Sequence, residues 1–181
     1  MGKALILYFS KYGSTKQYSE WIAKELNGEI ISIKNVNENS LKEYDIIILG
    51  SGLYAGGIKG TNIIVKNYEI LKNKKLIIFT CGLSNFKNSE NVDYVMENIK
   101  KSIPENIFSN INVFCLRGAI DYTKLTSIHR IMMWMKKKVI MKNEKNRMTE
   151  EGKGFLETYG KNVNFINKEE IREIIEYCKN I

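Results

Sequence analysis

The chain has 181 residues, 44% of them hydrophobic, and its 28 lysine and arginine residues outnumber 20 aspartate and glutamate residues, for a net charge of +8. This length suits one well-buried domain and is short for two. No apolar run approaches the roughly 18 residues of a membrane-spanning helix, and the amino terminus lacks a cleavage signal, so we expect a cytoplasmic protein. The three cysteines are widely spaced, which predicts reduced thiols and no metal site.

Short apolar runs alternate with amphipathic stretches from the amino terminus onward. The run YDIIIL at residues 44–49 is almost entirely apolar, which suits a strand covered on both faces of a sheet. Strands that are each followed by a helix or a loop predict an α/β domain with a doubly wound parallel sheet. The expected strands are residues 3–9, 29–33, 44–49, 75–80 and 111–116, and the expected helices are residues 15–26, 62–71, 89–101 and 168–179.

The connection after the fifth strand is much longer than a simple crossover requires. It runs over residues 117–167 and contains neither a repeat nor a low-complexity stretch. We therefore expect a basic helical insertion within a single domain of residues 1–181. Between His129 and Arg147 seven residues are basic and one is acidic. This local excess of positive charge favours an anionic partner.

The stretch SKYGST, residues 10–15, lies between the first strand and the first helix. In open parallel sheets this first turn is the usual phosphate site. Gly13 permits a close approach of the backbone, and the amides at the start of the helix point toward the same place. The hydroxyls of Ser10, Ser14 and Thr15 can donate to phosphate oxygens. The spacing is neither that of a Walker loop nor that of GxGxxG, and an ordinary capped turn is the alternative.

Two further loops are expected at the same edge of the sheet. GSGLYAGG follows the third strand at residues 50–57, and TCGLSNF follows the fourth at residues 80–86. Each loop offers small residues that can touch a flat ligand. Each also has one aromatic side chain, Tyr54 or Phe86, that can stack on a ring. A phosphate loop beside two such loops predicts a flavin mononucleotide (FMN) site.

These three loops resemble those of the flavodoxin family, over nearly the whole chain. The resemblance implies a three-layer fold with strand order 2-1-3-4-5 and noncovalent FMN. Tyr12 stands where flavodoxins commonly have threonine, so only its backbone amide is expected to contact the phosphate. The resemblance places the phosphate on Ser10, Lys11, Tyr12, Gly13, Ser14 and Thr15, one side of the flavin ring on Ser51, Gly52, Leu53, Tyr54, Ala55 and Gly56, and the other side on Thr80, Cys81, Gly82, Leu83, Ser84, Asn85 and Phe86.

The insertion resembles a narrower group within this family. LRGAIDYTKLTSIHRIMMWMKKKVIMK, residues 116–142, is similar to the G-A-x-x-Y segment and the basic, methionine-rich helix of the menaquinone-dependent protoporphyrinogen oxidases. That resemblance implies an FMN-dependent oxidoreductase of haem biosynthesis, which passes electrons from a porphyrinogen to a quinone or another acceptor. The alternative is a flavodoxin-type electron carrier that docks a redox partner protein and has no substrate of its own.

Residues 127–142 are expected to form the helix of the insertion, with one apolar stripe packed on the domain. The stripe comprises Ile128, Met132, Met135 and Val139, with Ile131 beside it. The remaining surface mixes basic and apolar residues, which suits anionic lipid at the inner face of the membrane, a propionate-bearing porphyrin or an acidic protein. A solvated basic face or a helix between the subunits of a homodimer is the alternative, and no nucleic-acid motif is recognised. The candidate substrate or partner surface comprises Asp121, Tyr122, Arg130, Trp134, Lys136, Lys137 and Lys138.

Four residues carry reactive side chains that need an interpretation of their own. His129 is the only histidine, and we expect a surface or structural role and not acid or base catalysis. Asp121 and Tyr122 follow the fifth strand, where they could contact substrate or flavin or could simply turn the chain. Cys81 is expected to be a small apolar filler, since no resolving cysteine is near it in sequence. No catalytic side chain is assigned, because a flavin supplies the redox chemistry itself.

Overall fold

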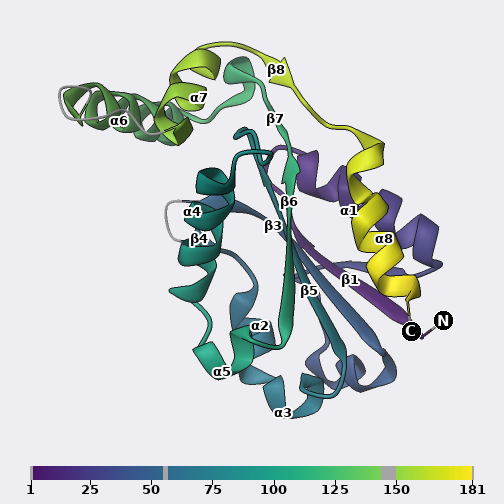
Figure 1. Cartoon of the computed structure of the whole chain (residues 1–181). Coiled ribbons are helices and arrows are strands. Elements are labelled where there is room, and N and C mark those ends of the chain that lie inside the picture. The colour runs from purple at the N-terminus through teal and green to yellow at the C-terminus, as the bar shows by residue number, and fades with distance from the viewer. Residues whose placement is uncertain (1, 55–56, 144–149, 181) are drawn as a thin grey trace.

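The computed structural model describes residues 2–54, 57–143 and 150–180. Five parallel strands form the main sheet in the order β2-β1-β3-β5-β6 (Figure 1). This confirms the predicted order 2-1-3-4-5, because the short strand β4 (Gly57–Ile58) adds one to the numbering and pairs antiparallel with the end of β3. The parallel strands are β1 (Ala4–Phe9), β2 (Glu29–Ser32), β3 (Ile46–Tyr54), β5 (Lys75–Gly82) and β6 (Ile111–Arg117).

The central strands are buried on both faces of the sheet. In β3 the side chains from Ile46 to Leu49 are fully buried. Successive side chains of a strand point to opposite faces, so Ile47 and Leu49 belong to one hydrophobic cluster and Ile46 and Ile48 belong to the other. A strand of this composition requires helices on both sides of the sheet, as the sequence predicted.

Two layers of helices cover these faces (Figure 1). Tyr18, Ile22 and Leu26 recur every fourth residue of α1 and are buried against one face. The helix predicted at residues 62–71 is divided at Asn67, because the Asn67 side chain donates a hydrogen bond to the carbonyl of Ile63 and its backbone leaves the helical region. One face carries α1 (Ser14–Leu26) and α8 (Arg172–Lys179), and the other carries α2 (Thr61–Lys66), α3 (Tyr68–Leu71), α4 (Ser89–Lys100) and α5 (Glu105–Phe108).

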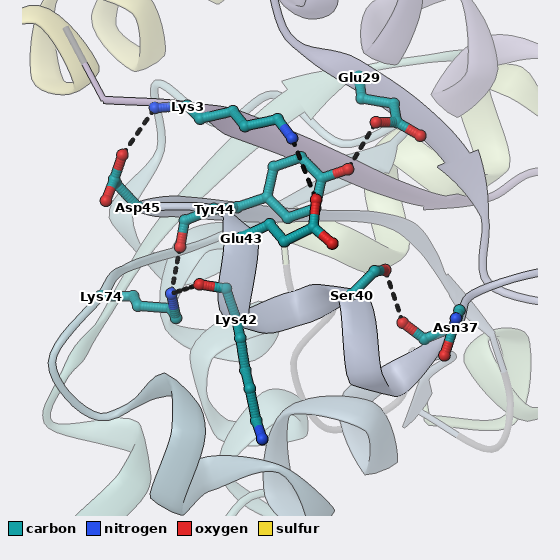
Figure 2. Close-up of polar contacts among 9 residues, drawn as sticks. All are labelled: Lys3, Glu29, Asn37, Ser40, Lys42, Glu43, Tyr44, Asp45 and Lys74. Carbon is teal, nitrogen blue, oxygen red and sulfur yellow. Dashed lines mark hydrogen bonds and ion pairs between the residues drawn. The ribbon is translucent and has the colours of Figure 1, made fainter.

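The amino ends of the strands are closed by a polar network, which Figure 2 shows. The Tyr44 hydroxyl donates to the Glu29 carboxylate at 2.5 Å, and Lys3 pairs with Glu43 at 3.4 Å. Lys74 donates to the carbonyl of Tyr44, just after the short helix η1 (Glu38–Glu43). The bond to Glu29 raises the pKa of Tyr44 to about 12. These contacts anchor the loops at this end of the sheet and leave the opposite end for the candidate site.

The insertion after β6 begins and ends as a small ribbon. Strands β7 (Ala119–Ile120) and β8 (Val163–Asn164) pair antiparallel and form its base. The helices α6 and α7 lie between them in the sequence, and α6 extends away from the sheet with α7 beside it (Figure 1). The remaining elements are η2 (Tyr122–Lys124), α6 (Ser127–Asn143), α7 (Glu150–Thr158) and η3 (Lys168–Ile171).

The expectation that an apolar stripe of α6 packs on the domain is wrong. Ile128 is 70% exposed and Val139 is 59% exposed, and Ile131 and Met135 are exposed as well. Only Met132 of the predicted stripe is half-buried. The helix packs through its opposite side, where lysines 136 and 137 lie over the rings of Phe155 and Tyr159. Sequence periodicity located an apolar face but could not show that the neighbouring α7 covers a different one.

Candidate functional site at the carboxyl edge of the sheet

Three loops meet where β1, β3 and β5 end. The register pairs Phe9 with Ser51, Ser51 with Thr80, and Gly52 with Cys81. The carboxyl ends of these strands therefore lie at the same edge of the sheet, as the sequence predicted, although β3 continues to Tyr54 through the first residues of the predicted second loop. Ser51 and Thr80 are buried, and the Ser51 hydroxyl donates to the Gly52 carbonyl at 3.1 Å while it accepts the amide of Lys59 at 3.2 Å.

The first loop leaves the amino end of α1 open to an anion. Gly13 is the N-cap residue with φ of 100°, no side chain caps the helix, and its first turn has no acidic residue. A Cβ at Gly13 would have no atom within 4 Å, so the space above the loop is clear. The amides of this first turn and the positive end of the helix dipole are arranged as in an anion site.

Two serine hydroxyls of this loop each accept a backbone amide. Ser10 Oγ accepts from the amide of Gly13 at 3.1 Å, and Ser14 Oγ accepts from the amide of Ala119 at 3.1 Å. An accepting hydroxyl still has its own hydrogen to donate. Thr15 differs, because it is buried and its hydroxyl contacts the Cys81 thiol. The Ser14 contact also ties the loop to β7, a link that nothing in the sequence indicated.

The second loop is described in part. Leu53 packs on the core cluster that lies under α2 to α5. Ala55, Gly56 and the side chain of Tyr54 were expected to contact the ring, and they lie outside the described residues.

In the third loop the ring of Phe86 lies against Gly82, where a Cβ would be 3.1 Å from Phe86 Cζ. The Asn85 side chain accepts the amide of Lys87, while Leu83 and Ser84 are half-buried. Burial raises the pKa of the Cys81 thiol to about 12, so a neutral, unreactive thiol is favoured, consistent with the role of a filler.

A partly buried hydrogen-bond cluster fixes the end of β6, and sequence reasoning missed it. The Tyr18 hydroxyl lies 2.7 Å from the carbonyl of Arg117 and 3.0 Å from the Glu170 carboxylate, which also accepts the amide of Arg117 at 2.7 Å. Burial, and to a smaller extent Glu170, raise the pKa of Tyr18. The Arg117 guanidinium stacks 3.7 Å from the centre of the Phe165 ring. The three polar residues lie in distant segments with no motif, so only the fold reveals the cluster.

His129 connects the insertion to the first loop. Lys11 Nζ lies 2.9 Å from His129 Nε2, and the Tyr12 hydroxyl contacts Nδ1. A lysine ammonium can only donate, so Nε2 accepts and the ring is neutral with its hydrogen on Nδ1. Partial burial, and next the charge of Lys11, lower the pKa of His129 and favour this neutral form. The expectation of a structural role fits these contacts.

A cavity of about 700 Å³ lies beside the first loop. Lys11 and Tyr12 form one wall, and the ribbon of β7 and β8 with Asp121 and Lys124 forms another. The Asp121 carboxylate accepts the hydroxyl of Thr123 at 2.6 Å and the amide of Thr123 at 2.9 Å, and it pairs with Lys124 at 3.4 Å. The Thr123 hydroxyl, and next the Thr123 amide and Lys124, lower the pKa of this carboxyl group. Of the predicted surface residues, Asp121 lies in this cavity wall.

A family profile described as "Flavodoxin domain" matches residues 5–148, which include all three loops and α6. The chain belongs to this family. An uncharacterized protein of Methanocaldococcus jannaschii is 32% identical over 124 residues, which are 66% of this chain and 78% of that protein.

Two solved structures align with the flavodoxin domain at lower identity. The two-electron reduced flavodoxin of Megasphaera elsdenii is 16% identical, with a TM-score of 0.44 over 62% of this chain and 82% of that one. A flavoprotein of Lactobacillus acidophilus NCFM in complex with FMN is 18% identical, with a TM-score of 0.43 over 65% and 93% of the two chains.

Tyr122 lies in η2 with its ring centre 5.5 Å from that of Tyr159, and the remaining predicted surface residues of this flavodoxin domain lie on α6. Arg130 donates to the carbonyls of Tyr122 and Thr123 at 3.2 and 3.1 Å, so it holds the start of the helix. Lys136 and Lys137 face α7, while Trp134 is 48% exposed with Lys138 Nζ 4.0 Å from its ring centre. The residues expected to form one surface are thus divided among the cavity wall, the α7 contact and the outside of the helix.

No group of three or more histidine, cysteine, aspartate or glutamate side chains in the described part of the chain could hold a metal ion. None of the helices within the described ranges has the length and apolar character needed to cross a bilayer.

Proposed function

We propose that this flavodoxin-domain protein binds FMN at the three loops and acts as an oxidoreductase on an anionic organic molecule of the porphyrinogen class. Electrons pass onward to a quinone or another acceptor. The observation that carries the proposal is the open amino end of α1 beside two serine hydroxyls that retain their hydrogens. Family membership supports FMN as the ligand of this loop.

The residues of the first loop fit a phosphate group. The amides of the first turn of α1 are donors, Ser10 and Ser14 add hydroxyl donors, and Lys11 adds a positive charge at the same loop. No carboxylate lies in the first turn to repel a dianion. An ordinary capped turn, which was the alternative, would carry a side-chain cap, and here the helix has none.

The other two loops are proposed to hold the ring. Gly52 of β3 pairs with Cys81 of β5 near the carboxyl ends of these strands, and both residues are small enough for a flat ligand to approach. A bound flavin supplies hydride and single-electron transfer. The chain's own part is to orient the ring, with Phe86 and Gly82 packed as one side of the third loop, and to keep the Cys81 thiol neutral beside it.

The cavity beside the first loop is the proposed substrate site. Its volume of about 700 Å³ lies within the roughly 300–1,000 Å³ of small-molecule sites. Lys11 and Lys124 provide cations, and Ala119, Ile120 and Val163 provide apolar wall. A carboxylate of the substrate would compete with Asp121 for Lys124, since that ion pair is exposed and weak. This combination suits an apolar ring system that carries carboxylates.

The alternative is an electron carrier that docks an acidic partner protein. It is favoured by the charge of α6, which has five basic residues and no acidic one between Ser127 and Asn143. Lys138 and Lys142 lie on or beside its exposed outer side. A carrier needs no substrate cavity. The two functions therefore differ in the electron donor, which is a small organic substrate for the enzyme and a redox partner protein for the carrier.

The test is anaerobic addition of protoporphyrinogen to the FMN-loaded protein, followed by menaquinone. Loss of the flavin absorbance and its return with the quinone are expected. Lys124→Gln should raise the apparent KM about tenfold, the effect of one charged hydrogen bond, and should leave FMN binding unchanged. Lys101→Gln, an exposed lysine outside the cavity, is the control. Flavin that porphyrinogen leaves oxidised but that a redox partner protein reduces would establish the carrier instead.

A further inference from the structure

The outside of α6 carries most of the exposed apolar side chains of the protein. Among the described residues eight large hydrophobic side chains are exposed, and six of them lie on this helix. Their exposed fractions range from 48% to 70%. This outer face comprises Ile128, Ile131, Trp134, Met135, Val139 and Met141.

The opposite side of the helix is held in place. The ammonium groups of Lys136 and Lys137 lie 5.1 and 4.5 Å from the ring centres of Phe155 and Tyr159 on and just after α7. At the start of the helix His129 contacts the first loop. Turning the outer face inward would break all of these contacts. The outer face is therefore a stable feature of the folded chain that needs an external occupant.

Charge identifies the kind of occupant. Between Ser127 and Asn143 the helix has five basic residues and no acidic residue. Lys138 and Lys142 lie on or beside the outer face, and the Lys138 ammonium lies 4.0 Å from the ring centre of Trp134. Lysine side chains of this kind keep their charge among headgroups while their stems and an aromatic ring lie deeper. Apolar residues flanked by basic ones are typical of helices that lie in a membrane interface.

We propose that the outer face of α6 docks the protein on anionic lipid bilayers, with the helix lying along the interface. A helix of 17 residues is about 26 Å long. Its five charges oppose insertion across the bilayer, while they favour contact with anionic headgroups. A second copy of the chain fits less well, because a two-fold axis through this face would oppose two clusters of like charge.

Docking would also orient the candidate site. His129 links α6 to the first loop, so the carboxyl edge of the sheet lies on the side of the docked helix (Figure 1). A lipid-soluble quinone in the bilayer would then be near the proposed flavin. This step alone rests on the proposed function, whereas the docking itself stands on the exposed residues and their charge.

The first test is flotation of the full chain with vesicles of phosphatidylcholine alone or with a quarter of phosphatidylglycerol. We expect binding to the anionic vesicles that weakens as salt rises, and little binding to the neutral ones. Ile128→Ser with Ile131→Ser should reduce binding at least tenfold. Tyr94→Ser, a change at an exposed aromatic residue on α4, should have no effect. Anionic vesicles that fail to float the parent protein, or float the double variant equally, would overturn the proposal.

A charge test separates this surface from the net charge of the protein. Lys138→Gln with Lys142→Gln should weaken binding about 30-fold, since each lysine near an anionic surface contributes about a factor of five. Lys24→Gln with Lys101→Gln removes the same charge from exposed positions on and next to other helices and should weaken binding less than threefold. Equal losses in the two pairs would mean that only net charge matters, which contradicts docking through α6.

Two further measurements complete the test. The substitution Trp21→Phe leaves Trp134 as the fluorescent tryptophan. Brominated lipids should quench its fluorescence, and an unquenched signal would place α6 outside the membrane interface. A different outcome would assign the outer face to a subunit interface. In that outcome the parent protein is a dimer that does not bind vesicles, and the double variant Ile128→Ser, Ile131→Ser is a monomer. The FMN content and the reduction of a soluble acceptor should be the same in all of these variants, so a failure of docking is distinguishable from a failure of the proposed function.

Discussion

Replacement of Gly13 by alanine tests the first loop with little disturbance of packing. Gly13 has φ of 100°, and a Cβ there would have no atom within 4 Å, so the only cost is backbone strain. That strain is about 1–2 kcal/mol for an L-residue. It would lower Tm by roughly 2–8 °C in a domain of this size. A loop that relaxes to negative φ moves the amides of the first turn of α1, and losing one charged hydrogen bond weakens FMN binding roughly 10- to 150-fold.

Gly160 provides the matched control. It has φ of 78° and equally open space at its Cβ, and it follows α7. Gly160→Ala should lower Tm by a similar amount and change the FMN dissociation constant less than twofold. Fluorescence titration of the apoproteins with FMN and thermal unfolding measure both quantities. Equal FMN affinity in the parent and Gly13→Ala would refute the phosphate assignment.

Three other predictions follow from the packing and the titrating groups. A Cβ at Gly50 would collide with the ring of Phe79, so Gly50→Ala should lower the free energy of unfolding by about 1–3 kcal/mol. Gly154 lies in open space within α7, so Gly154→Ala should raise the free energy of unfolding by about 0.5–1 kcal/mol. Unfolding in urea measures both changes. Because desolvation raises the pKa of Cys81 to about 12, iodoacetamide at pH 8 should label it only after unfolding, and labelling of the folded protein would contradict the raised pKa. Because the pKa of His129 is lowered by burial and by a neighbouring lysine, its contribution to stability is present above its unfolded pKa of about 6.5 and is lost as pH falls below that value. His129→Gln should reduce the difference in unfolding free energy between pH 7.5 and 5.5, and an unchanged difference would show that His129 does not titrate in this range.

The parallel sheet was predictable because its strands have a strong and simple signal. Continuous apolar runs such as residues 44–49 can only be buried on both sides, and alternation with amphipathic helices then leaves few topologies. The strands β4, β7 and β8 were missed, since two residues have no periodicity to detect. The helix α7 was missed too, because its boundary lies in a segment with mixed polar residues.

The candidate site was predictable at the level of loops and not of contacts. SKYGST was placed correctly between β1 and α1, because an apolar run precedes it and an amphipathic helical pattern follows it. The amide of Ala119 on Ser14 and the contacts of His129 depend on how the insertion returns to the first loop. The orientation of α6 was predicted wrongly for a related reason: both of its sides carry apolar residues, and only the presence of Phe155 and Tyr159 decides which side is covered.

The central claim is that the first loop binds the phosphate of FMN, and a comparison of FMN with riboflavin tests it most directly. Riboflavin has the same ring system and lacks the phosphate, so the difference in affinity isolates the contribution of the loop. Two charged hydrogen bonds of about 1.5–3 kcal/mol each predict that the apoprotein binds FMN at least about 100-fold more tightly than riboflavin. Equal dissociation constants for FMN and riboflavin would contradict the account.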